Sequence, residues 1–329
     1  MTRRLRTRGA STETFRCDAN CQTHERSFDM ASLSTWLDAK LAAGSVKQHR
    51  QIQPPELNTR WLQTPAGTIR VFDSGGDKPC VVMAPDGPNV LEHYQGLFAL
   101  LAPQVRVVCF DMPGFGFSAP SAAYDHSLEQ GAAAILSVLD QLNIAKATLA
   151  LSCANGFYAM RVAQRAPHRV ASLLLSQTPS VEAMHRWTER VVPRPLTLPV
   201  LGQAVSWVFR QKMAKSWYRI ALPKTTDGAP FQQTARHALR CGGCFSLAGV
   251  VQGLIRESVN ATQGISTPCT VLWGSQDRSH RLTDPLAILR DAPHAEVVRF
   301  DGCGHFPDLE NPQLFVQTLL SQMARYTHA

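Results

Sequence analysis

A single cysteine stands where the chain changes from an apolar run to a segment that favours a helix. Residues 148–152 have the apolar character of a buried strand, and residues 154–166 have the composition of a helix. Cys153 lies between them, so we expect its thiol at the apex of a sharp strand-to-helix turn. A thiol in that place can attack an acyl carbon once a base has taken its proton. Ser152, which has alanine two residues away on either side, is the alternative nucleophile.

Two later segments carry the partners that such a thiol needs. An apolar run ends in a turn that holds Asp277, and a glycine-rich turn further along the chain holds His305. An imidazole can accept the proton of the thiol and return one to the leaving group. A carboxylate can fix the tautomer of the imidazole and stabilise its charged form. The sequence therefore predicts a catalytic triad of Cys153, His305 and Asp277.

The segments that must position these residues alternate between strand-like and helix-like patterns. The expected strands are 61–63, 69–73, 80–84, 105–110, 148–152, 171–176, 269–273 and 296–300. The expected helices are 93–101, 128–142, 154–166, 285–290 and 312–325. Such alternation is typical of an α/β fold, in which helices cover both faces of a mostly parallel sheet.

The alternation stops over residues 179–265. This stretch begins with a proline-rich loop, continues with helical segments rich in aromatic residues, and holds 11 Lys/Arg against 4 Asp/Glu, a balance of +7. We expect it to form a helical cap over the sheet. Its positive charge favours an anionic or carrier-bound acyl substrate. A solvated helical surface would explain the charge equally well.

The composition sets the expected organisation of the whole chain. Residues 1–29 are rich in Arg, Ser and Thr and are expected to be a disordered extension, with the core formed by 30–178 and 266–329 and the cap by 179–265. Nine cysteines without an export signal favour the cytoplasm. No apolar run is long enough to span a membrane, so membrane contact is not expected. No basic run is interleaved with aromatics, so nucleic acid is not an expected partner. The oligomeric state is left open.

Four short motifs follow one another in a fixed order. In chain order they are the loop Asp111-Met-Pro-Gly-Phe-Gly-Phe-Ser118, the strand–turn–helix segment at Cys153, and the turns that carry Asp277 and His305. With them the chain resembles the α/β-hydrolase family, in particular its cap-bearing branch, over residues 60–178 and 266–325. The loop resembles the family's D-x-P-G-x-G-x-S motif. Cysteine stands in place of the usual nucleophilic serine.

The resemblance bears on the choice of nucleophile. Ala159, Pro167 and Val170 lie six, fourteen and seventeen residues after Cys153, and these offsets match the family's pattern after its nucleophile. Counted from Ser152, each offset is one residue too long. A shift of one residue would turn the side chain away from the apex, so the pattern favours Cys153.

The resemblance also implies a fold and an oxyanion hole. The fold would be an eight-stranded, mostly parallel sheet flanked by helices, with a helical cap insertion. The backbone N–H of Ala154, at the start of the helix after Cys153, would face the developing oxyanion. Residues 85–88 take the place of the family's H-G-x-P loop, so Asp86 or Gly87 would supply a second N–H.

The residue at the nucleophile position restricts the expected activity. Haloalkane dehalogenases and epoxide hydrolases of the family need a carboxylate there, and the thiol excludes them. Cysteine members, of which dienelactone hydrolase is the best-known kind, cleave activated esters or lactones. We therefore expect a hydrolase or acyl-transfer enzyme of esterase or thioesterase type, acting on an ester, lactone or thioester through an acyl-Cys153 intermediate. No cofactor and no metal ion is expected.

Three departures from the family's pattern support an alternative. Leu151 and Asn155 replace the small residues that flank the family's nucleophile, and Pro85 replaces the loop histidine. The alternative is a non-hydrolytic protein with the same fold, either a lyase or a ligand-binding pseudoenzyme. Assays of hydrolysis and of ligand binding would distinguish the two.

Overall fold

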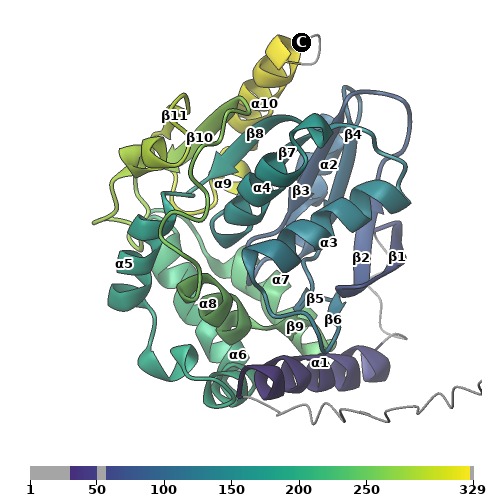
Figure 1. Cartoon of the computed structure of the whole chain (residues 1–329), viewed down its shortest axis with the longest axis vertical. Coiled ribbons are helices and arrows are strands. Elements are labelled where there is room, and N and C mark those ends of the chain that lie inside the picture. The colour runs from purple at the N-terminus through teal and green to yellow at the C-terminus, as the bar shows by residue number, and fades with distance from the viewer. Residues whose placement is uncertain (1–29, 50–56, 327–329) are drawn as a thin grey trace, which may run out of the picture.

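The central element of the structure is a sheet whose main path contains eight strands (Figure 1). The computed structural model describes residues 30–49 and 57–326, so the expected extension 1–29 lies outside the described residues. The eight strands are β1 Thr59–Thr64, β2 Gly67–Asp73, β3 Cys80–Ala84, β4 Arg106–Phe110, β7 Ala147–Ser152, β8 Val170–Ser176, β10 Cys269–Gly274 and β11 Glu296–Phe300. Their order across the sheet is β1-β2-β4-β3-β7-β8-β10-β11, and the short β6 Ala119–Pro120 pairs beside β2.

The pairing of these strands confirms the expected α/β class. The five pairs from β4 to β11 are parallel. The pairs β1–β2 and β2–β4 at the other edge are antiparallel. The carboxyl ends of the parallel strands therefore meet at one edge of the sheet, where ligands bind in open α/β sheets.

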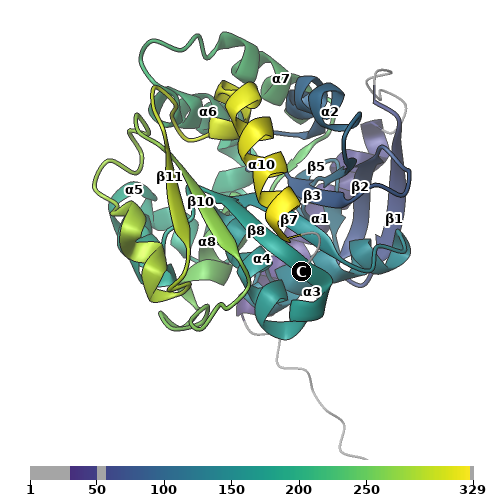
Figure 2. The same ribbon diagram turned by 90° about the horizontal axis from the view of Figure 1, so that it is seen from above.

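Helices cover both faces of this sheet. Two of them, α3 Leu128–Gln141 and α4 Ala154–Arg165, pack on one face, and α2 Gln95–Leu101 and α10 Pro312–Tyr326 pack on the other (Figures 1 and 2). Successive residues of a strand point to opposite faces. In β3, Val82 therefore belongs to the core under α3 and α4, and Val81 belongs to the core under α2 and α10.

The element boundaries agree with the sequence patterns. Every expected strand is present, with its ends within two residues of the expected positions. The segment 285–290 is the 3₁₀ helix η4 Pro285–Arg290, and the segment 93–101 begins within the 3₁₀ turn η1 Leu91–Tyr94. Three short elements complete the core: η2 Pro167–Arg169, α9 Pro307–Glu310 and β5 Phe115–Gly116. No helix within the described ranges has the length and apolar character needed to cross a membrane.

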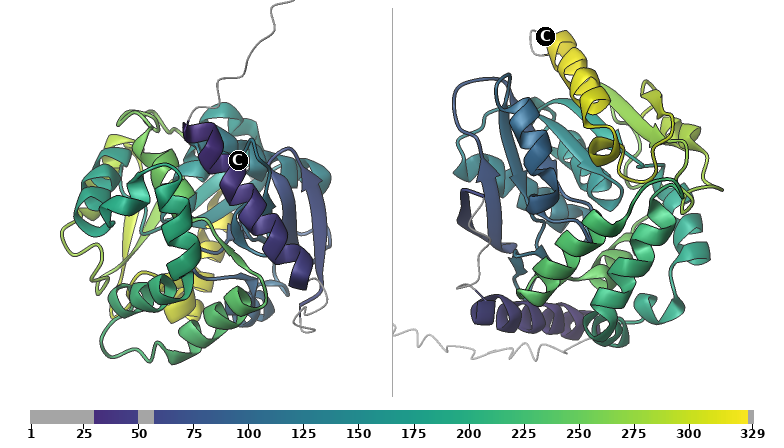
Figure 3. Two further views of the ribbon diagram at one scale, coloured as in Figure 1. Left: turned by 90° about the horizontal axis from the view of Figure 1, so that it is seen from below. Right: turned by 180° about the vertical axis from the view of Figure 1, so that it is seen from behind.

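A helical insertion follows β8. Its elements are α5 Val181–Val191, η3 Arg194–Thr197, α6 Leu201–Ala221, α7 Ala229–Arg240, β9 Cys244–Phe245 and α8 Leu247–Ile255. Helices α6, α7 and α8 gather at one end of the sheet (Figure 1; Figure 3, right). Strand β9 pairs with β5, which joins the insertion to the loop that begins at Asp111.

Helix α1 Met30–His49 lies against this insertion (Figure 3, left). It packs against α6, α8 and β6. The Ser34 Oγ accepts a hydrogen bond from the Val200 N–H at 3.0 Å, and the Asp38 Oδ2 accepts one from the Gln203 Nε2 at 3.3 Å. The first described helix therefore joins the insertion to the edge of the sheet, a position that the sequence patterns did not predict.

Candidate active site

Cys153 forms the sharp bend between β7 and α4. Its backbone has φ 52° and ψ −123°, a left-handed conformation that costs a non-glycine residue about 1–3 kcal/mol. The neighbouring strand holds it there, because the Cys153 N–H donates to the Ser176 carbonyl at 2.7 Å. The Thr178 hydroxyl donates to the Cys153 carbonyl at 3.1 Å. A Cβ at Gly156 would lie 2.2 Å from the Thr178 hydroxyl oxygen, so the turn requires glycine three residues after Cys153.

Ser152 lies in a different setting. It is the last residue of β7 and pairs with Ser176 in the ladder with β8. Cys153 is the residue at the apex, and it lines the cavity under the insertion together with Ala154 and Asn155. The geometry therefore gives Cys153, the residue that the offsets favour, the position from which a nucleophile could reach a ligand.

His305 and Asp277 are brought together in the buried interior beside this bend. The His305 Nδ1 lies 2.5 Å from the Asp277 Oδ2. Asp277 also accepts hydrogen bonds from the Gln177 side chain at 2.6 Å and from the Ser279 hydroxyl at 2.6 Å. Burial alone would raise the pKa of Asp277, but the charge and hydrogen bond of His305 hold it below its ordinary value. Asp277 is thus an ionised carboxylate that fixes the imidazole.

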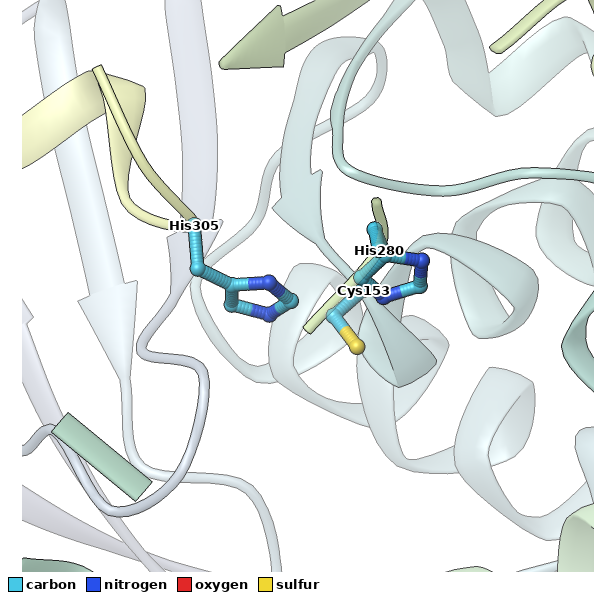
Figure 4. A group of neighbouring side chains, drawn as sticks. All are labelled: Cys153, His280 and His305. Atoms are coloured by element: carbon cyan, nitrogen blue, oxygen red, sulfur yellow. The ribbon is translucent and has the colours of Figure 1, made fainter. Parts of the chain in front are cut away.

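The thiol lies next to the imidazole. The sulfur of Cys153 and ring nitrogens of His280 and His305 lie within 4.8 Å of one another (Figure 4). Burial would lower the pKa of His305, but the charge of Asp277 and hydrogen bonds with Asp277, Asp86 and Cys153 raise it well above its ordinary value. The two carboxylates that contact the ring therefore favour its protonated form.

Asp86 places a carboxylate directly on His305. Its Oδ2 lies 3.1 Å from the His305 Nε2, the nitrogen that is not bound to Asp277. Burial raises the pKa of Asp86, and the interactions with His305 oppose this shift. The sequence predicted a role only for the backbone N–H at position 86. The side chain introduces a charge beside the place where an oxyanion would form.

The same carboxylate affects the thiol. Burial raises the pKa of Cys153 above its ordinary value, and the negative charge of Asp86 raises it further. The hydrogen bond with His305 lowers the pKa but does not outweigh these effects. The direction of this shift favours the neutral thiol, and a thiol is a good nucleophile only after its proton is removed.

Two backbone segments face the thiol where an oxyanion hole is expected. Ala154 at the start of α4 and Gly87 in the loop after β3 both line the cavity. The Asn155 Nδ2 donates a hydrogen bond to the Pro85 carbonyl at 3.0 Å, which ties the bend to the loop. Asn155 and Pro85, which depart from the family's pattern, thus hold the two segments together.

A mostly apolar cavity of about 370 Å³ opens above Cys153. Residues after β3 and β7 form its floor, and the insertion forms its walls. The wall residues include Met184, Trp187, Thr188 and Val191 of α5, Met213, Trp217 and Ile220 of α6, and Val250, Val251 and Leu254 of α8. This volume suits a small ligand with an apolar portion.

His280 is a residue of the site that no sequence pattern predicted. Its ring stacks on Trp187 with centroids 5.1 Å apart and on His305 with centroids 5.4 Å apart. The His280 Nδ1 lies 3.2 Å from the Thr283 hydroxyl, while the Nε2 has no hydrogen-bond partner among the described residues. Burial lowers the pKa of His280 to about 3, so the ring is neutral. A histidine three residues after Asp277 was the only signal in the sequence.

Cys153, His280 and His305 are the described residues whose ligand atoms could meet at a metal ion. The hydrogen bonds of His305 argue against this use. Both of its ring nitrogens are engaged by carboxylates, Asp277 on one side and Asp86 on the other. An ion would have to displace Asp86 from the nitrogen that faces the site, so the arrangement fits proton transfer better than metal binding.

Comparison with known proteins identifies relatives of this chain. A model of the alpha/beta hydrolase family matches residues 81–318. A dihydrolipoyllysine-residue acetyltransferase component of the acetoin cleaving system from Pseudomonas putida is 27% identical over 274 residues, covering 78% of this chain and 67% of that protein. A 2-hydroxy-6-oxononadienedioate/2-hydroxy-6-oxononatrienedioate hydrolase from Pseudomonas sp is 24% identical over 290 residues, covering 79% of this chain and 93% of that protein.

Solved structures share the fold. Epoxide hydrolase A from Mycobacterium thermoresistibile has a TM-score of 0.67 and 18% identity, over 81% of this chain and 98% of that one. A thermophilic esterase from Thermogutta terrifontis has a TM-score of 0.63 and 19% identity, over 82% and 99%. At this level of identity the likeness concerns the fold alone. The family model, in contrast, spans more than half of the chain, and the chain belongs to the alpha/beta hydrolase family.

Proposed function

We propose that this chain is a hydrolase that cleaves an activated ester, lactone or thioester through an acyl-Cys153 intermediate. One observation carries the proposal: the thiol at the strained bend opens into an apolar cavity beside an imidazole that is bound to a buried carboxylate. Membership of the family and relatives named as hydrolases support hydrolysis as the class of reaction.

The first step must free the imidazole. At rest the His305 Nε2 proton is shared with Asp86. The raised pKa of Asp86 allows this carboxylate to take that proton, which leaves His305 neutral. His305 then accepts the proton of Cys153, and the thiolate attacks the carbonyl carbon to form the carbon–sulfur bond. Asp86 is now a neutral acid, so no negative charge of its own opposes the developing oxyanion.

The remaining steps use the same groups. Backbone N–H groups of Ala154 and Gly87 stabilise the oxyanion, an interaction worth about 10²–10³ in rate for each donor. The tetrahedral intermediate collapses, the bond to the leaving group breaks, and His305 returns its proton to that group. Water then attacks acyl-Cys153 with His305 as the base, which releases the acid and restores the thiol.

The test uses a panel of activated esters, lactones and thioesters. We expect wild type to turn over members of the panel, Cys153→Ala to lose at least 10³-fold in kcat, about the effect of removing a nucleophile, and Ser152→Ala to keep activity within a few-fold. Intact-mass analysis after rapid quenching should show an acyl adduct on wild type and on Ser152→Ala. Activity that survives in Cys153→Ala and disappears in Ser152→Ala would assign the attack to the serine.

The contact between Asp86 and His305 also favours a second candidate function. If the carboxylate kept the Nε2 engaged, the imidazole could not act as a base and the cavity would only bind its ligand. This version predicts no turnover of the panel, no adduct, and tight binding of a small apolar ligand that Cys153→Ala leaves unchanged.

The panel should also contain the dienedioate that the name of the Pseudomonas relative gives as its substrate. With this compound the assay also detects cleavage of a carbon–carbon bond.

A further inference from the structure

A second pocket lies on the outer side of α6. It has a volume of about 580 Å³ and is lined by Lys212, Lys215, Ser216, Tyr218, Arg219, Leu222, Pro223, Lys224, Thr226, Gly228, Gln232 and Arg278. Five of these residues are cationic and none is acidic. None of the five cations forms an ion pair with another described residue. We call this the basic pocket.

Helix α6 separates the basic pocket from the cavity above Cys153. Lys212, Lys215 and Arg219 recur at helical spacing and line the basic pocket. Met213 follows Lys212, and Trp217 lies two residues after Lys215. Both therefore point to a different side of the helix, and both line the cavity. Ser216 and Arg219 line both spaces. The cavity and the basic pocket therefore adjoin along α6, where the apolar side of the helix meets its basic side.

The basic pocket also adjoins the loops that carry the triad. Arg278 follows Asp277 directly, and its Nη1 donates a hydrogen bond to the Arg219 carbonyl at 2.8 Å. Leu222 follows Ala221, whose carbonyl accepts a hydrogen bond from the His305 N–H at 2.9 Å. A ligand in the basic pocket would thus lie on the other side of α6 from the cavity and next to the acid and histidine loops.

The charge of the basic pocket is uncompensated. Asp277 precedes Arg278 directly, but its carboxylate is bound to His305, Gln177 and Ser279. Asp227 of the insertion is exposed, and one of its oxygens accepts a hydrogen bond from the Ala229 N–H at 2.9 Å. Five uncompensated cations in a hollow raise the local concentration of anions and strengthen their binding. An apolar cavity on one side and a basic pocket on the other match a ligand that is apolar at one end and anionic at the other.

We infer that the leaving group of the substrate carries an anionic group, a phosphate or a carboxylate, which the basic pocket binds while the acyl part fills the cavity. This inference rests on the proposed function for the position of the bond to be cleaved, which lies at Cys153 between the two ends. Pockets of about 300–1,000 Å³ hold cofactor-sized or drug-sized ligands, so the basic pocket has room for more than one small anion.

The experiment compares three thioesters with the same butyryl group. Their thiols are N-acetylcysteamine, which is neutral, 3-mercaptopropionate, which carries a carboxylate, and coenzyme A, which carries phosphates. All three present the same reacting carbonyl to Cys153. We expect at least one anionic thioester to have a KM well below that of the neutral one, and which of the two it is identifies the anion. Added salt should raise the KM of the anionic thioester only.

A charge reversal with a matched control tests the site itself. Lys215→Glu should raise the KM of the preferred anionic thioester about tenfold, since the reversal turns an attraction into a repulsion, and should leave the neutral thioester unchanged. Lys146→Glu makes the same charge change at an exposed lysine that precedes β7, at the far end of the strand from Cys153. This control should affect none of the thioesters.

A binding measurement separates this inference from the proposed function. If no thioester is turned over, Cys153→Ala titrated with coenzyme A and with 3-mercaptopropionate still reports on the basic pocket. Binding of either that is weakened by Lys215→Glu but not by Lys146→Glu supports the pocket even though the proposed function has failed. Equal KM values for the three thioesters, or, without turnover, binding of neither probe, would overturn the inference. An equal response of neutral and anionic thioesters to Lys215→Glu would also overturn it.

Discussion

At the scale of single residues, His305 lies between two carboxylates. Asp277 is bound to its Nδ1 and Asp86 to its Nε2. The sequence predicted the pair with Asp277 because the order of the motifs is fixed along the chain. It did not predict the contact with Asp86, because that contact depends on how the loop after β3 folds towards the histidine.

The Asp86 carboxylate should be visible in the pH dependence of the reaction. It raises the pKa of His305 through a hydrogen bond and the pKa of Cys153 through its charge. If the Nε2 proton leaves to solvent rather than to Asp86, kcat/KM of wild type should therefore rise with pH at values above the ordinary imidazole pKa of 6.5. In Asp86→Asn both pKa values fall, and the rising limb should move to lower pH by about one unit.

The control for this prediction is the activity at the plateau. If Asp86 only tunes the two pKa values, Asp86→Asn keeps a plateau kcat/KM close to that of wild type. If the transfer of the Nε2 proton to Asp86 is an obligatory step, the variant loses activity at every pH. A rising limb that stays where it is in wild type would contradict both versions.

At the scale of elements, the sequence predicted the strands and helices because each has one strong pattern. The strands are short apolar runs bounded by turns, and their two buried faces require such runs in a parallel sheet. The sequence did not predict what lies between the elements. Asn155 reads as a misfit beside a nucleophile, whereas in the fold its side chain reaches the Pro85 carbonyl and joins the bend to the loop.

Removing the hydrogen bond between Asn155 and Pro85 should lower kcat more than it lowers the stability of the fold. In Asn155→Ala the hydrogen bond to the Pro85 carbonyl at 3.0 Å is removed, and the N–H of Gly87 is no longer held relative to that of Ala154. We expect kcat to fall about tenfold, less than the 10²–10³ that follows the loss of a whole donor. Thermal unfolding should report a loss of about 1 kcal/mol. An unchanged kcat would show that the loop is held by other contacts.

At the scale of the whole molecule, α1 fastens the insertion to the sheet. It packs against α6, α8 and β6, and its buried Asp38 accepts a hydrogen bond from Gln203 of α6. No local pattern could have predicted this, because a helix that precedes the sheet by several residues can pack at many places. The hydrophobic periodicity of α1 is weak, so even its buried face was not evident from the sequence.

The Asp38 carboxyl should make stability depend on pH. Burial raises its pKa from 3.8 to about 6, against hydrogen bonds from Gln203 and Ser246 that lower it. The unfolded chain ionises near 3.8, so this contribution to stability is complete below that pH and is lost as the pH rises through about 6. In Asp38→Asn the loss should be absent.

The measurement is the free energy of unfolding of both proteins between pH 4 and pH 7. Wild type should lose on the order of 1–3 kcal/mol relative to Asp38→Asn over this range. The other buried carboxyls titrate in both proteins, so the difference isolates Asp38. A constant difference across the range would mean that Asp38 has its ordinary pKa in the folded protein.

The state of Cys153 also has a consequence for its reaction with oxidants. Peroxides and alkylating reagents attack the thiolate, and a protonated thiol reacts with them slowly. Burial and the charge of Asp86 raise the pKa of Cys153 and so favour the protonated thiol. If Cys153 attacks as proposed, the Asp86 carboxylate also protects the sulfur from oxidants between turnovers, and a reagent that mimics the substrate should label Cys153 far faster than a general alkylating reagent does.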